Sequence, residues 1–144
     1  LINYHYLKGE PDLAIEYGER CLRIGDAAGD VGLQALARGY LGYSCHAQGL
    51  YHRAHSILRE NVEALELVQG DAPGGQTGVS YVTSSGWLAF TLAELGEFDA
   101  AALSLDRAQR AGEASGHAYT QTIARTMAAG HRRVKNIHHA ANRR

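Results

Sequence analysis

The sequence predicts an all-α protein, and three observations lead to this expectation. Apolar residues recur at spacings of three and four, as in Leu58, Val62 and Leu65, which is the period of an amphipathic helix. Alternation of apolar and polar residues is nowhere sustained, so we expect no strands. Only two prolines occur, Pro11 and Pro73, and neither interrupts an apolar-periodic stretch.

Length and composition indicate a single domain over residues 1–144. The chain is 45% hydrophobic and 20% charged, and no apolar run approaches the roughly 18–20 residues of a membrane span. Its first residue is Leu and its one methionine is Met127, so we expect a piece of a longer protein. Two cysteines, Cys21 and Cys45, are too few for a disulfide framework and indicate buried free thiols in a reducing cytoplasm.

Breaks in the apolar pattern divide the chain into helices joined by short turns. Glycines mark most of the breaks, and Pro11 lies in the first turn of a helix whose apolar face should include Leu13 and Ile24. The stretch GDAPGGQTG, residues 70–78, predicts a long loop within one stack rather than a linker between domains. The helices are expected over residues 1–8, 11–28, 31–48, 51–69, 79–95, 98–114 and 118–136, before a frayed tail at 137–144.

The charged residues are divided unevenly along the chain. All 15 acidic residues precede residue 114, whereas five of the 14 basic residues follow residue 130. A basic tail can bind nucleic acid or an anionic surface. Because no aromatic residues are interleaved with these basic ones, the pattern favours a solvated helix end, and we expect neither a nucleic-acid nor a membrane partner.

Three turn glycines share one internal frame, since each is followed five positions later by an alanine. The three segments are Gly9 to Ala14, Gly49 to Ala54 and Gly96 to Ala101. The pairs Leu41-Gly42 and Leu88-Ala89 precede the second and third glycines by the same distance. Small residues at such positions let two helices approach closely, so the frame predicts a series of packed antiparallel helix hairpins.

This frame resembles the tetratricopeptide repeat, whose pattern has Leu-Gly in the first helix, a Gly-x-Tyr turn and Ala in the second helix. The middle unit is the best match, with Leu41-Gly42, Gly49, Tyr51 and Ala54. The turn glycines are 40 and 47 residues apart, against a usual period of about 34. That variant is similar to the repeat regions of bacterial multidomain regulators, including nucleotide cyclases with an ATPase module and large transcriptional activators.

The resemblance implies a right-handed superhelical stack of about 3.5 antiparallel helix hairpins. Its units would cover residues 1–29, 30–70 and 78–115, with a partial unit at 117–136 and the tail at 137–144. In such stacks the first helix of each hairpin lines a concave groove that holds peptides or partner helices.

Carried over position by position, the resemblance implies eight groove residues in the three full units. These are Asn3, Tyr6, Gly39, Tyr43, His46, Gly86, Phe90 and Glu94, to which the partial fourth unit adds Met127, His131 and Lys135. Aromatic side chains are suitable anchors for a bound peptide. The alternative is that Tyr43 and Phe90 fill the groove by packing against neighbouring helices.

The sequence indicates neither a metal site nor a reaction. His46, His52 and His55 lie near Cys45, but no carboxylate completes a ligand set, so solvated histidines beside a turn are the favoured interpretation. No nucleophile is accompanied by a base and an orienting group, and GDAPGGQTG lacks the Lys-Ser/Thr ending of a phosphate-binding loop. We therefore expect no enzyme activity, no cofactor and no metal.

The function expected from these patterns is non-catalytic recognition of a protein or peptide, as one module of a larger bacterial cytoplasmic regulator. Two alternatives remain open. The module could be a homo-oligomerisation element, because a truncated terminal repeat leaves an apolar face that a second copy could cover. It could also be a sensor domain for a small ligand or a signalling peptide.

Overall fold

The computed structural model describes the backbone of residues 1–69 and 75–141, and this part of the chain contains seven α-helices and no strand. The helices are α1 (Ile2–Leu7), α2 (Pro11–Ala28), α3 (Val31–Ala47), α4 (Tyr51–Gln69), α5 (Gly75–Glu94), α6 (Phe98–Ala114) and α7 (Ala118–Ala141). The prediction of an all-α protein is therefore confirmed. Helices α4 and α6 begin and end at the predicted residues.

Glycines in the left-handed backbone region close the turns between helices. At Gly49, where φ is 75°, the Gly49 N–H donates to the His46 carbonyl and the Leu50 N–H donates to the Cys45 carbonyl, both at 2.9 Å. This pair of bonds is the Schellman motif that ends a helix, and it recurs at Gly9, Gly29 and Gly96. A side chain at these positions would strain the backbone, so the glycines determine where the chain reverses.

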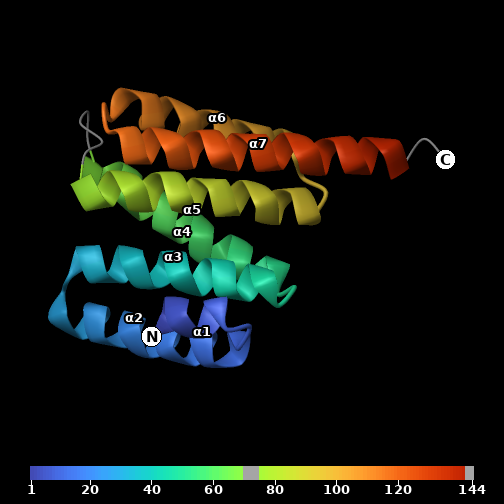
Figure 1. Ribbon diagram of the computed structural model, residues 1–144. Helices are drawn as coiled ribbons and strands as arrows, with labels where there is room; N and C mark the ends of the chain where they lie inside the picture. Colours follow the sequence, from blue (N-terminus) through green and yellow to red (C-terminus); the bar gives the residue numbers. More distant parts are fainter. Residues whose placement is uncertain (70–74, 142–144) are drawn as a thin grey trace.

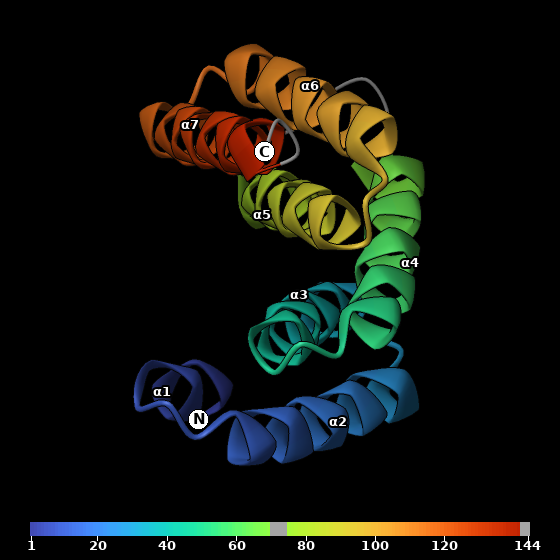
Figure 2. The same ribbon diagram turned by 90° about the vertical axis from the view of Figure 1, so that its right-hand side faces the viewer.

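The helices form two layers that follow an arc (Figures 1 and 2). We call α1, α3, α5 and α7 the inner layer and α2, α4 and α6 the outer layer. Each helix packs against the next along the chain, and each inner helix also packs against the next inner helix. Within the described residues the backbones of the outer helices do not pack against one another, and long side chains alone join them: Arg53 of α4 donates to Glu19 of α2, and Arg107 of α6 pairs with Glu66 of α4. As a result, the inner layer lies on the concave side of the arc (Figure 2).

The core lies between the layers and is built around small residues. The frame alanines Ala14, Ala54 and Ala101 are each 0% exposed. A Cβ atom added at Gly42 would lie only 2.5 Å from Cγ of Leu58, so α3 and α4 are closer there than any other residue would allow. The predicted close approach of helices at the frame positions is therefore present at this hairpin.

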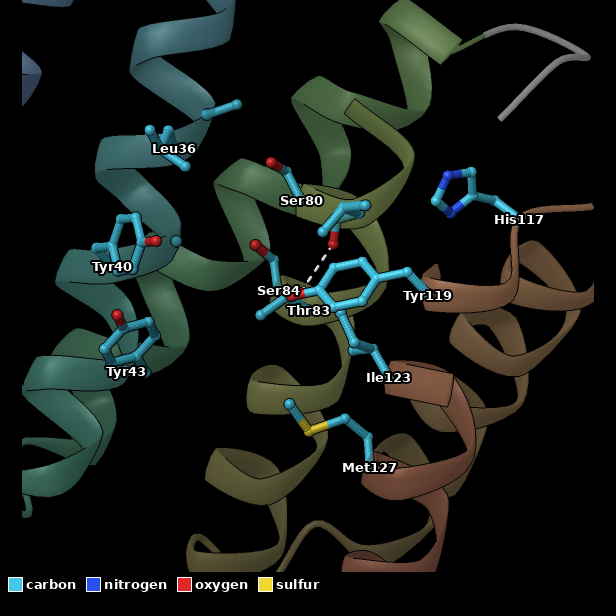
Figure 3. A pocket seen from close by; sticks show the side chains of 13 residues that line it. Leu36, Tyr40, Tyr43, Ser80, Thr83, Ser84, His117, Tyr119, Ile123 and Met127 are labelled. Atoms are coloured by element: carbon cyan, nitrogen blue, oxygen red, sulfur yellow. Dashed lines mark hydrogen bonds between the residues drawn. The ribbon is translucent and has the colours of Figure 1, made fainter. Parts of the chain in front are cut away.

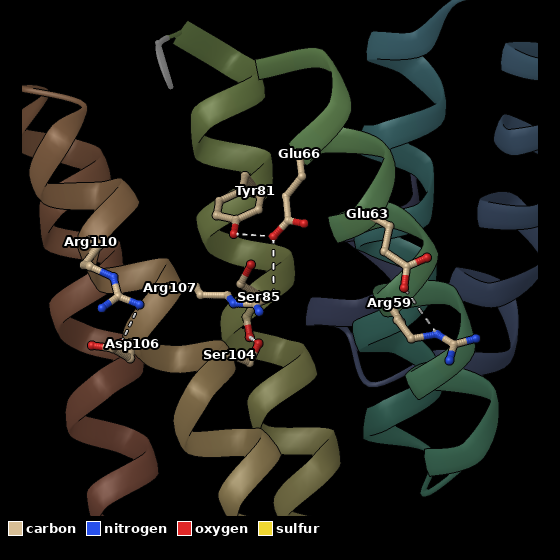
Figure 4. A network of polar contacts seen from close by, with 9 residues as sticks. All are labelled: Arg59, Glu63, Glu66, Tyr81, Ser85, Ser104, Asp106, Arg107 and Arg110. Atoms are coloured by element: carbon tan, nitrogen blue, oxygen red, sulfur yellow. Dashed lines mark hydrogen bonds and ion pairs between the residues drawn. The ribbon is translucent and has the colours of Figure 1, made fainter. Parts of the chain in front are cut away.

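Polar contacts connect the outer helices across α5 (Figure 4). Glu66 of α4 accepts a hydrogen bond of 2.9 Å from the Tyr81 hydroxyl of α5, and its carboxylate lies 3.8 Å from Arg107 of α6. Burial, followed by the bond to Glu66, raises the pKa of Tyr81 to about 12. Glu66 thus links α4 and α6, two helices that do not pack against each other.

Two predicted boundaries are wrong. Helix α5 begins at Gly75, so residues 75–78 are helical rather than part of a loop, and residues 70–74 lie outside the described part of the chain. Gly78 is buried, and packing of α5 against its neighbours outweighs the helix penalty of about 1 kcal/mol for a glycine. Helix α7 continues to Ala141 because no glycine or proline ends it earlier, so 137–141 are not a frayed tail.

The predicted apolar face of α2 is also partly wrong. Leu13 and Ile24 are 40% and 55% exposed, whereas Ile15, which was not assigned to that face, is 8% exposed. The buried side of α2 passes through Ala14, Ile15 and two glycines rather than through its largest apolar side chains. Because α2 approaches α3 closely, small residues occupy the side of α2 that faces α3. Leu13 and Ile24 lie at the edges of that buried side.

Candidate functional site

The main cavity on the concave side is a groove of about 630 Å³ in the inner layer. Helix α5 forms its floor, and α3 and α7 form its two walls (Figure 3). The groove is lined by Ala35, Leu36, Gly39, Tyr40, Tyr43, Val79, Ser80, Thr83, Ser84, His117, Tyr119, Ile123 and Met127. The walls are possible because α3 and α7 each pack against α5 and not against each other.

The groove lining carries hydroxyl groups and apolar side chains but no fixed charge. None of its residues is Asp, Glu, Lys or Arg, in a chain in which these make up 20%. Of the hydroxyls, Tyr43 donates to Asn3 Oδ1 at 3.0 Å and Thr83 donates to the Val79 carbonyl at 2.8 Å. The remaining hydroxyls, on Tyr40, Ser80, Ser84 and Tyr119, donate to no acceptor in the described part of the chain.

A buried amide supports the floor of the groove from behind. Asn61 of α4 is 0% exposed, and its Nδ2 donates to the Ala35 carbonyl and to Ser84 Oγ, both at 2.9 Å. Because a carbonyl can only accept, these bonds identify Nδ2 and leave the hydrogen of the Ser84 hydroxyl free to donate. A Cβ added at Gly39 would lie 3.4 Å from Ser84 Oγ, so the missing side chain of Gly39 leaves room for α3 beside Ser84, which is itself only 1% exposed.

The structure brings only two of the eight predicted groove residues, Gly39 and Tyr43, into the groove. Asn3 and Tyr6 of α1 lie behind Tyr43. The Tyr43 hydroxyl donates to Asn3, and the centroids of the Tyr6 and Tyr43 rings are 4.6 Å apart. The predicted contribution of α1 is therefore support of a groove residue, not lining of this cavity.

The other predicted residues lie further along α3 and α5, outside this cavity. His46 donates to or accepts from Thr91 Oγ1 at 3.0 Å, and its ring lies 5.3 Å from that of Trp87. Phe90 also packs on Trp87, at 5.6 Å between centroids. Burial lowers the pKa of His46, and the exposed carboxylate of Glu94 acts in the opposite direction.

Two further predicted residues, Gly86 and Phe90, pack against helix α7. A Cβ at Gly86 would lie 2.7 Å from Cγ of Met127, and a Cβ at Gly130 would lie 2.9 Å from Cζ of Phe90. Gly86 and Phe90 therefore serve packing between α5 and α7. Met127 lines the groove as expected, whereas the side chains of His131 and Lys135 lie outside the described ones.

An aromatic cluster at the junction of α1, α3 and α5 explains much of this placement. Tyr43 is 7% exposed and contacts Tyr6, Tyr40 and Trp87, with ring centroids 4.6, 5.2 and 5.5 Å away. Burial, followed by the neighbouring phenols of Tyr40 and Tyr6, raises the pKa of Tyr43. Most of the surface of Tyr43 is therefore covered by neighbouring helices, as the alternative interpretation expected. Tyr43 nevertheless remains one of the residues that line the groove.

Sequence reasoning missed Tyr40, Ser80 and Tyr119. A signal was available, since Leu36, Tyr40 and Tyr43 follow helical spacing, as do Tyr119, Ile123 and Met127. The carried-over positions lie about one turn too far along α3 and α5, and the true start of α5 was hidden by the predicted loop. The position of Tyr119 depends on how α7 packs across α5, which no local pattern contains.

A second cavity of about 580 Å³ lies beside the short helix α1. It is formed by residues of α1, α2 and α3, and its lining includes Cys21, which is partly buried. Cys45 is buried in the core, and burial raises the pKa of its thiol. Among the side chains that the structure describes, no three His, Cys, Asp or Glu residues are close enough to share a metal ion.

Comparisons with known proteins complete the description of the chain. Neither protein-family models, nor curated proteins, nor solved structures give a match to it. Within the described residues, no helix combines the length and the apolar character needed to cross a membrane. The groove between α3, α5 and α7 is therefore the main basis for an argument about function.

Proposed function

We propose that this chain is a non-catalytic recognition module, built as a tetratricopeptide-like superhelical stack, which binds a peptide segment in the groove between α3, α5 and α7. The stack is supported by the repeated Schellman turns at Gly9, Gly49 and Gly96 and by the equal burial of the alanines that follow them. It is also supported by the contact pattern, in which inner helices pack against one another and outer helices are joined only by ion pairs between long side chains. Following the resemblance, we place the module in a larger bacterial cytoplasmic regulator.

The observation that carries the functional proposal is the groove itself. It is a hollow of about 630 Å³ with aromatic and aliphatic walls and unpaired hydroxyls, on the concave side of the arc. Aromatic residues such as Tyr40 and Tyr119 offer contact area at a low cost in side-chain entropy. A surface of this shape and composition suits a peptide better than a flat protein face or a charged polymer.

The chemistry of the lining argues against catalysis there. His117 carries the one imidazole among the lining side chains, and it is exposed on the rim rather than bonded to a groove hydroxyl. A hydroxyl nucleophile requires a base within hydrogen-bonding distance, and among the described lining residues no such pair is present. Binding without reaction is the function that these groups support.

The proposal is tested by selecting peptides from a random phage-displayed library against the chain and measuring their dissociation constants by fluorescence anisotropy. Ser80→Trp fills the floor of the groove and should weaken selected peptides at least about tenfold, that is by 1.4 kcal/mol. Ala102→Trp, at an exposed position of the outer helix α6, is the matched control and should bind as the wild type does. Selected peptides that bind Ser80→Trp unchanged would show that the groove is not the binding site.

Self-association is a second candidate, favoured by one exposed face. Leu1, the N-cap of α1, and Tyr4 and Leu7 within that helix are spaced by three and are 76%, 57% and 74% exposed. A second copy could cover this face. Light scattering at increasing concentration tests the idea, with Leu7→Lys as the variant expected to shift a dimer to monomer. A strict monomer at millimolar concentration would contradict it.

A further inference from the structure

The chemistry of the groove narrows the class of segment that it can take, on the premise that the groove is the binding site proposed above. The lining has no charged side chain, so a carboxylate or a phosphate placed there would lose its hydration without gaining a partner. A lysine or an arginine would lose its hydration in the same way. The segment in contact with the groove must therefore be uncharged.

The unpaired hydroxyls require acceptors from the bound segment. Tyr40, Ser80 and Tyr119 each place a hydroxyl at the groove without an acceptor in the described part of the chain. An α-helix cannot supply acceptors along its length, because its own N–H groups already use its carbonyls. An extended segment has free carbonyls along its whole backbone and can satisfy these donors.

The groove is poor in strong acceptors. Its lining contains neither a carboxylate nor a carboxamide, and the carbonyl of Val79 is already used by Thr83. A bound β-strand would bring backbone N–H groups that find few partners, and each unpaired N–H is costly to bury. A segment rich in proline lacks those N–H groups and keeps its carbonyls free.

We propose that the occupant of the groove is an uncharged, proline-rich segment in the polyproline II conformation. Its proline rings pack against the rings of Tyr40 and Tyr119 and the aliphatic side chains of Ile123 and Leu36. Its backbone carbonyls accept hydrogen bonds from the tyrosine and serine hydroxyls. Aromatic grooves recognise such segments because the extended conformation is already formed before binding, so little entropy is lost.

The test compares three labelled, end-blocked peptides of equal length on the intact chain. They are PPLPPLPP, the charged analogue PPEPPEPP, and AALAALAA, which keeps the leucines and restores the backbone N–H groups. We expect PPLPPLPP to bind at least about tenfold more tightly than either analogue. Equal or tighter binding of PPEPPEPP or AALAALAA would overturn the assignment.

Single hydroxyl deletions test the proposed hydrogen bonds. Tyr40→Phe and Tyr119→Phe should each weaken PPLPPLPP by roughly two- to twelvefold, as expected for loss of one hydrogen bond, while the rings keep their packing. Tyr4→Phe, at an exposed position on α1 outside the groove, is the control and should leave the affinity unchanged. Unchanged binding by both groove variants would refute the role of the hydroxyls.

The library selection separates this inference from the proposed function. Selected peptides that require the open groove, as shown by Ser80→Trp, but that are charged or helical would leave the proposed function intact and overturn the proline-rich assignment. If no peptide, PPLPPLPP included, depends on the open groove, both are wrong. Proline-rich, uncharged sequences among the groove-dependent binders would support both.

Discussion

Replacing Gly42 by alanine is a direct test of how α3 and α4 pack. The new Cβ would lie 2.5 Å from both Cγ and Cδ2 of Leu58, whereas ordinary contacts of this kind begin at 3.4 Å. Restoring that distance requires a shift of roughly 0.9 Å between the helices or by Leu58. Leu58 is 0% exposed, so its side chain has no free space to enter.

The size of the effect follows from two opposing terms. Overpacking a close-packed core costs about 1–3 kcal/mol, and the full burial of Leu58 places this site near 3 kcal/mol. Alanine in place of a mid-helix glycine contributes about 1 kcal/mol of helix propensity in the other direction. We therefore expect Gly42→Ala to lower the free energy of unfolding by about 2 kcal/mol, or Tm by roughly 4–8 °C.

Urea unfolding followed by circular dichroism measures this change. Gly32→Ala, at an exposed position whose added Cβ would meet only the Asp30 side chain, at 3.4 Å, is the matched control and should be neutral or stabilising. Leu58→Ala alone should cost about 2–5 kcal/mol, but less in the Gly42→Ala background, because the new methyl group occupies part of the vacated space. A Gly42→Ala midpoint at or above that of the wild type, or additive single effects, would refute the packing argument.

Three further predictions concern buried polar groups. Asn61→Ala removes two buried hydrogen bonds, one to the Ala35 carbonyl and one to Ser84 Oγ, so the free energy of unfolding should fall by about 1–3 kcal/mol in urea titrations; a neutral variant would contradict the buried bonds. Burial holds the pKa of His46 below 6.5, so the unfolded chain takes up this proton first as the pH falls. Stability should then decline as the pH falls below about 6.5, and His46→Gln should remove part of that decline. Because the pKa of Tyr81 is raised to about 12 from 10.0, Tyr81→Phe should leave the 295 nm titration of the folded chain unchanged below about pH 11, and a smaller absorbance step near pH 10 would refute this. By the same linkage the unfolded chain loses the Tyr81 proton first, so stability should decrease above pH 10.

The helices were predictable where local signals agree. Gly49 and Gly96 break the apolar pattern and are also needed for a left-handed turn, so α4 and α6 were located to the residue. The start of α5 was not predictable, because Gly75 and Gly78 carry the local signal of a loop, whereas packing around the buried Gly78 keeps that residue helical. The burial of Ile15 in place of Ile24 was equally hidden, since it depends on the distance between α2 and α3.

The candidate site was predictable only in part. The helical frame correctly placed Gly39 and Tyr43 on the concave side, because helical period determines which face a residue occupies. It could not tell that Tyr6 and Trp87 cover most of Tyr43, since these contacts join residues far apart in the chain. Nor could it place Tyr119 opposite Tyr40, because that depends on the tilt of α7 across α5.

Neighbouring outer helices are joined only by ion pairs between long side chains, and this has a mechanical consequence. When a bent beam changes its curvature, the layer with the stiffest contacts keeps its length. In this arc that layer is the inner one, because its helices pack directly against one another. Changes of curvature are therefore taken up by the spacing of α2, α4 and α6. Between α4 and α6, that spacing is restrained by the 3.8 Å ion pair of Glu66 with Arg107, which added salt screens. The elastic stiffness of this half of the arc should thus depend on ionic strength, although the groove itself carries no charge.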